Sequence, residues 1–116
     1  MTLKEFAENT NLDYEGIVAR FCGMESLVIK FLKKFPDDPT FDSLTQAVEA
    51  KDYDAIEKSA HALKGVTGNL GLQELFAVNQ KIVDAVRSGQ YDVIPEYFRK
   101  DQEIYDNVMQ CLKELD

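Results

Sequence analysis

Apolar residues recur every three or four positions along most of the chain, the spacing that places them on one face of an α-helix. This pattern predicts helices over about 24–35, 40–50, 52–67, 72–88 and 94–115. Two shorter helices are expected before them, the first capped by Thr2 with Glu5 and the second by Asp13, and Asp52 can cap the helix over 52–67. No alternating strand pattern competes, so the sequence predicts an all-α fold: an antiparallel four-helix bundle with short additional amino-terminal helices.

The ends of these helices and their buried faces follow from the same pattern. Prolines at 36 and 39 are expected to end the helix over 24–35, and Gly89 the helix over 72–88. The buried faces are predicted to include aromatic as well as aliphatic residues, among them Phe31 and Phe76. Each apolar face needs the other helices to cover it, which favours a packed bundle.

The composition narrows the range of functions. A chain of 116 residues fits one domain, which we expect to span 1–116. A net charge of −8 argues against binding to nucleic acid or to anionic membranes. No apolar run approaches the roughly 20 residues of a membrane span, and no signal peptide is recognised, so we expect a cytoplasmic protein. Cys22 and Cys111 are far apart in the chain, and only one histidine is present, so a zinc site is not expected. We interpret both cysteines as buried or idle thiols.

His61 is the only histidine, and its position on the helix is unusual. At about 100° per residue, Ala60, Leu63 and Thr67 fall within roughly 40° of Ile56 and define the buried side. His61 points about 140° away from Ile56, so it is predicted to face solvent rather than the core. A neutral imidazole is an available nucleophile near pH 7.

Two glycines and a lysine share the face of His61. Gly65 and Gly68 follow it within a helical stretch, where glycine costs about 0.8–1 kcal/mol relative to alanine. Close approach of a partner to the backbone would explain them, and Gly68 has the alternative of marking the helix end. Lys64, one turn from His61, can supply a cation to phosphoryl oxygens, whereas Lys58 has no feature beyond those of a surface lysine. One isolated nucleophile without a phosphate loop or second histidine indicates a carrier rather than an enzyme.

The segment AHALKGVTGNLG at 60–71 closely resembles the signature of histidine-containing phosphotransfer domains. That signature has a small residue before the histidine, Leu63-Lys64-Gly65 after it, and a glycine ten residues on, here Gly71. The similarity extends more weakly over about 27–86. Some family members carry a glutamine on the following helix that hydrogen-bonds the histidine. Val83 occupies that position here, and Gln80 or Asn79 is a possible substitute.

The resemblance implies a phosphorelay intermediate of two-component signal transduction. His61 would accept a phosphoryl group on its outer ring nitrogen from a receiver phospho-aspartate and pass it to another receiver aspartate. Lys64 would hold the phosphate, while Gly65 and Gly68 would give the receiver room. The chain would need no cofactor of its own, since Mg²⁺ and the acidic residues would come from the partner receiver domains of response regulators or hybrid sensor kinases.

Two other functions stay open at this point. The phosphoacceptor domain of a chemotaxis-type histidine kinase shares an exposed histidine on a bundle. An inert helical adaptor would instead bind a partner through exposed apolar residues of the amino-terminal helices, such as Phe6. No kinase ATP-binding region or receiver aspartate site is recognised, so the sequence fits a free-standing relay protein or a domain excised from a larger kinase.

Overall fold

The computed structural model describes residues 1–116, and α-helices make up most of it. The helices are α1 (Leu3–Thr10), α2 (Tyr14–Arg20), α3 (Glu25–Leu32), α4 (Thr40–Ala50), α5 (Tyr53–Asn69), α6 (Gln73–Arg87) and α7 (Ile94–Glu114). Short 3₁₀ turns occur at Phe35–Asp37 and Tyr91–Val93. The predicted all-α class is confirmed.

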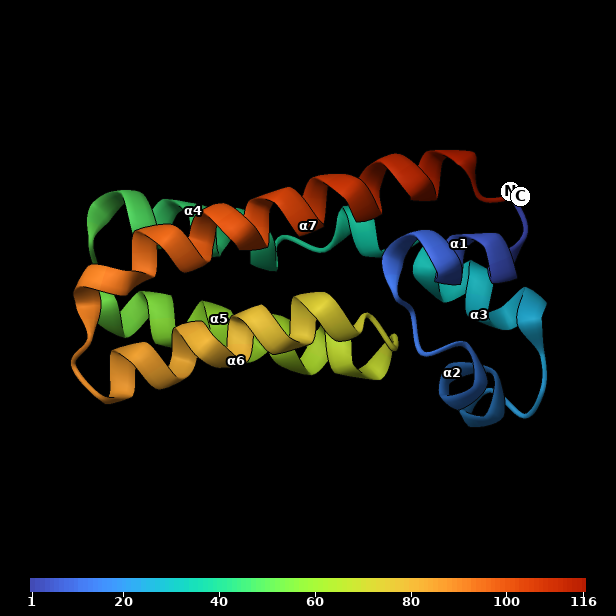
Figure 1. The fold of residues 1–116 in the computed structure, drawn as a ribbon, viewed down its shortest axis with the longest axis horizontal. Helices are drawn as coiled ribbons and strands as arrows, with labels where there is room; N and C mark the ends of the chain where they lie inside the picture. Colours follow the sequence, from blue (N-terminus) through green and yellow to red (C-terminus); the bar gives the residue numbers. More distant parts are fainter.

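Four of the helices form an elongated bundle (Figure 1). α5 packs against α6 and α4, and α6 packs against α7. The three amino-terminal helices gather at one end of this bundle, where the two chain termini meet (Figure 1). The Asp116 amide donates to the Met1 carbonyl over 2.9 Å, which joins the termini directly.

One hydrophobic core runs through both parts of the fold. It extends from Leu3 in α1 to Leu115 just after α7. On one side of the bundle, Phe41 of α4 stacks on Tyr105 of α7, with ring centroids 3.8 Å apart. Phe6, which the adaptor hypothesis would expose, is fully buried, so it cannot serve as a partner contact.

Several helix starts follow the predicted capping chemistry. Thr2 and Glu5 form a reciprocal capping box at α1. The carboxylates of Asp13 and Asp52 accept from backbone amides in the first turns of α2 and α5. These side chains satisfy amides that the helices themselves leave unpaired.

The predictions for two aromatic residues and one helix are wrong. Phe31 and Phe76 are each 39% exposed rather than buried. The helix predicted over 24–35 ends at Leu32, and the chain then forms the 3₁₀ turn that contains Pro36. This helix lies with α1 and α2 at the bundle end, where only part of its surface is covered, so Phe31 packs against Phe21 at 5.3 Å instead of entering the bundle.

Candidate functional site

His61 lies on α5 and is exposed to solvent, as the helical geometry predicts. The opposite face of α5 is fully buried through Ile56, Ala60, Leu63 and Thr67. The side chain of His61 makes no hydrogen bond or ion pair with the rest of the chain. It is therefore free to meet a partner.

Three contacts between α5 and α6 mark the seam along which the two helices meet near His61. They join Glu57 with Arg87, Lys64 with Gln80, and Gly68 with Phe76. Because the helices are antiparallel, each step along α5 toward its carboxyl end meets a residue nearer the start of α6. His61 falls between the first and second contacts. The Glu57–Arg87 ion pair therefore lies on one side of it, and the hydrogen bond between Lys64 and Gln80 lies on the other.

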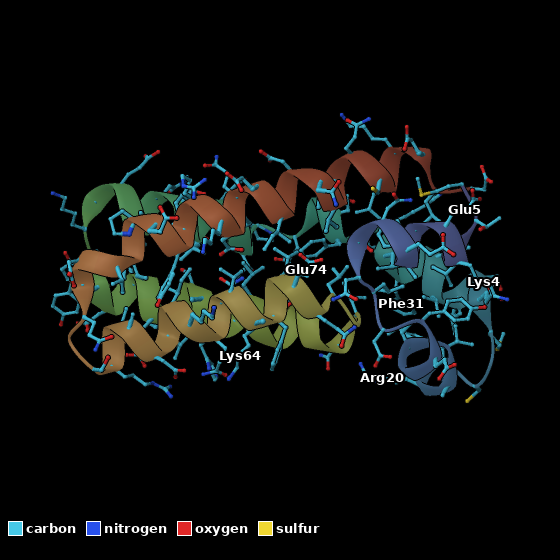
Figure 2. The ribbon with its side chains drawn as sticks, in the orientation of Figure 1. Lys4, Glu5, Arg20, Phe31, Lys64 and Glu74 are labelled. Atoms are coloured by element: carbon cyan, nitrogen blue, oxygen red, sulfur yellow. The ribbon has the colours of Figure 1, made fainter.

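Lys64 is half-buried and leans across the seam toward α6. Its Nζ donates to Gln80 Oε1 over 2.8 Å and lies 5.8 Å from the centroid of the Phe76 ring. Figure 2 shows Lys64 on the layer formed by α5 and α6, away from the amino-terminal helices. Lys58, by contrast, is exposed and forms no ion pair.

The two glycines near His61 differ in their surroundings. A Cβ added at Gly65 would meet nothing within 4 Å, so this stretch of backbone is open to an approaching surface. A Cβ added at Gly68 would lie 3.1 Å from Cδ2 of Phe76. Gly68 therefore has an intramolecular reason to be glycine, because the Phe76 ring occupies the space beside it.

The position of the family glutamine is occupied by a core residue. Val83 is fully buried. Asn79 is fully buried as well, and its amide donates to the Leu75 carbonyl and to Asp101, so it cannot reach His61. Gln80 faces the seam and bonds Lys64. Of the two possible substitutes, only Gln80 belongs to the surface around His61.

An open groove of about 530 Å³ begins next to Gly68. Phe76 and Leu72 of the α6 region line it, together with Asn11 from the link between α1 and α2. Gly71 also lines it and has φ +72°, a conformation that favours glycine, and an added Cβ would meet Ile17 at 3.2 Å. The amino-terminal segment thus shapes the surface beyond the histidine.

Arg20 connects this segment to the histidine-bearing helix. Its Nη1 donates to the carbonyl oxygens of Gly68 and Asn69, over 3.0 and 2.7 Å. Figure 2 shows Arg20 pointing from α2 toward the α5–α6 turn. The Asn69 carbonyl has no other donor, and the Gly68 carbonyl also accepts from the Gly71 amide over 3.3 Å. Arg20 therefore acts as a cap at the end of α5, supplied from a distant part of the chain.

Comparison with known proteins identifies the family. A model described as Hpt domain matches residues 26–116. The chain belongs to this family. Hpt domains are phosphocarrier modules of histidine phosphotransfer in phosphorelay signalling, and they interact with receiver domains of two-component systems. The match runs from the first turn of α3 to the last residue, further than the similarity recognised over 27–86.

Two other comparisons gave no match. No curated protein and no solved structure is significantly similar to this chain. Within this Hpt chain, no helix combines the length and apolar character needed to cross a membrane.

Sequence reasoning found His61, Lys64 and the glycines but missed three residues around them: Arg20, Gln80 as a partner of Lys64, and Asp84, which accepts from Gln80 Nε2 over 2.9 Å. Arg20 and Gln80 bond groups on another helix, 48 and 16 residues away in the chain, so only the packing of the helices identifies them. Asp84 lies one turn from Gln80 on α6 and gains its role only through that contact.

Proposed function

We propose that His61 accepts a phosphoryl group from the phospho-aspartate of one receiver domain and passes it to the aspartate of another. The observation that carries this proposal is the exposed, unpaired His61 on a helix whose opposite face is buried. Membership of the Hpt family supplies the reaction class. The open backbone at Gly65 supports it further, because a second protein has to bring its phospho-aspartate to the imidazole.

In the proposed reaction, Nε2 of the neutral imidazole attacks phosphorus. A nitrogen–phosphorus bond forms while the phosphorus–oxygen bond to the receiver aspartate breaks, and the aspartate leaves as a carboxylate. The proton on Nδ1 passes to solvent, which leaves a neutral phosphorylated ring. Transfer to the second receiver reverses these steps. The phosphoryl group is not hydrolysed in these steps, so it stays available for the next receiver.

Lys64 is proposed to offset the negative charge of the phosphoryl oxygens, one turn from His61. Gly65, and Gly68 beyond it, would leave room for the receiver. Mg²⁺ held by the receiver would supply further positive charge at the phosphoryl group. The chain itself would need positioning groups only, in line with phosphoryl transfer depending mainly on placement and charge.

We further propose that residues 1–116 act as one domain in the cytoplasm, either alone or as part of a kinase. The phosphoacceptor domain of a chemotaxis-type histidine kinase remains the alternative. It would receive phosphate from an ATP-binding kinase domain instead of from a receiver, so the phosphoryl donor distinguishes the two functions.

The test uses receiver domains loaded with radiolabelled phosphate and incubated with the intact chain. Label should move to the wild type in an acid-labile, alkali-stable form and should be absent from His61→Gln. Lys64→Ala should slow the transfer, whereas Lys58→Ala, a matched change of an exposed lysine on the same helix, should not. Label retained by His61→Gln, with unchanged circular dichroism, would refute the assignment.

A further inference from the structure

The ammonium group of Lys64 has a fixed place in the protein without phosphate. Most lysines on a helix surface move among many rotamers. Lys64 is half-buried, and its Nζ is held between the amide oxygen of Gln80 and the ring of Phe76. A cation held in this way is ready before any phosphoryl group arrives.

Gln80 is itself oriented by a second residue on α6. Its Nε2 donates to Asp84 Oδ1 over 2.9 Å, one turn along the helix. The carboxylate of Asp84 can only accept and the ammonium of Lys64 can only donate. The amide of Gln80 therefore has one chemically consistent orientation, with nitrogen toward Asp84 and oxygen toward Lys64.

The polar and apolar residues near Gln80 on α6 cannot replace it as a hydrogen-bond partner of Lys64. Asn79 and Val83 are fully buried on the core side of α6. Gln80 and Asp84 lie on the side that faces the α5 seam, at the level between Gly68 and Glu57, where His61 also lies. The chain thus has valine where the family glutamine would bond the histidine, and a glutamine one turn earlier that bonds the lysine instead.

We propose that Gln80, oriented by Asp84, is the positioning residue that holds Lys64 beside His61 for phosphoryl transfer. This inference rests on the proposed function of His61. When His61 carries a phosphoryl group, the Lys64 ammonium would turn to the oxygens from the place where Gln80 and Phe76 of α6 hold it. Gln80 acts through Lys64 and does not touch the phosphoryl group.

The first arm of the test observes Lys64 directly. The ¹H–¹⁵N signal of a lysine ammonium is visible when a hydrogen bond slows its exchange with water. We expect this signal in the wild-type chain and its loss in Gln80→Ala. Gln80→Glu should keep it, because a carboxylate accepts the same hydrogen bond. A signal that persists in Gln80→Ala, or that is lost in both variants, would overturn the contact.

The second arm measures the rate of phosphoryl transfer from a labelled receiver. Gln80→Ala should slow transfer on the order of fivefold, the effect of one lost hydrogen bond on positioning. The double variant with Lys64→Ala should be no slower than Lys64→Ala alone, because Gln80 acts only through Lys64. Gln102→Ala, a change of an exposed glutamine on α7, serves as the matched control and should transfer at the wild-type rate.

The two arms separate the possible failures. A wild-type rate in Gln80→Ala, with His61 still phosphorylated, would overturn the positioning role and leave the proposed function intact. Independent slowing by the two changes would also overturn it, since Gln80 would then act on something other than Lys64. A chain that shows the Lys64 signal but takes no phosphate would overturn the proposed function, and the role of Gln80 in the reaction with it.

Discussion

The buried carboxyl of Asp101 gives the chain a stability that depends on pH near neutrality. Asp101 lies in the middle of α7, is fully buried, and accepts from the Asn79 amide over 3.1 Å. Two acceptor oxygens at this place have no partner, Asn79 Oδ1 and Asp101 Oδ2. Burial raises the pKa of Asp101 from 3.8 to about 7, and the hydrogen bond from Asn79 only partly opposes the rise.

The sign of the effect follows from proton binding. The folded chain holds the Asp101 proton more tightly than the unfolded chain does, so stability is fully present below pH 3.8 and is lost as pH rises through about 7. One proton changes the free energy of unfolding by about 1.4 kcal/mol per pH unit. The loss over the whole window is therefore about 4 kcal/mol, of which about 2 kcal/mol falls between pH 5 and pH 7.

The substitution Asp101→Asn removes this titration and supplies a permanent N–H donor to a site with unpartnered acceptors. We expect urea unfolding to show the variant more stable than the wild type at pH 8, with a flatter profile from pH 5 to pH 8. Asp106→Asn, a change of an exposed carboxylate on the same helix, should keep the wild-type profile. Glu5 and Glu96 do not interfere, because hydrogen bonds with Thr2 and Arg99 lower their pKa values below 4.5. Parallel profiles for the wild type and Asp101→Asn would refute the reasoning, as would a carboxyl ¹³C titration of Asp101 with its midpoint below pH 5.

Three further predictions concern the end of α5. Gly65→Ala should raise the free energy of unfolding by up to about 1 kcal/mol, because a helical glycine is replaced where the added Cβ meets nothing. Gly65→Trp should slow phosphoryl transfer while circular dichroism shows an intact fold. Loss of the fold would contradict the interpretation that the surface at Gly65 is open. Gly68→Ala should gain less in thermal unfolding than Gly65→Ala, because its Cβ would press on the Phe76 ring at 3.1 Å, and an equal gain would show that this contact has no effect. Arg20→Ala should cost about 1 kcal/mol and speed amide hydrogen exchange in the last turn of α5, since the Asn69 carbonyl loses its donor and the Gly68 carbonyl keeps only the Gly71 amide. Unchanged exchange would exclude a capping role.

The fold was predictable where a local rule decides it. The capping side chains of Thr2, Asp13 and Asp52 each accept a hydrogen bond from the backbone amide three residues later, so the local sequence is enough to predict them. Phe31 and Phe76 show the limit of this reasoning. Apolar spacing predicts which face of a helix is hydrophobic, but not how much of that face another helix covers. The rings of Phe31 and Phe76 both lie at the edge of a covered face.

The site shows the same division between local and long-range information. The exposure of His61 follows from its angle on a single helix, and Lys64 and Gly65 follow from the next turn. The partner of Lys64 lies 16 residues away on another helix, and Arg20 lies 48 residues from the carbonyl that it caps. A shift of α6 by one turn would bring Phe76 or Asp84 opposite Lys64 in place of Gln80, with different chemistry in each case. The information that places His61 at the surface is therefore local. The contacts of Lys64 depend instead on how α5 and α6 are aligned, and that alignment is set by the buried residues of both helices.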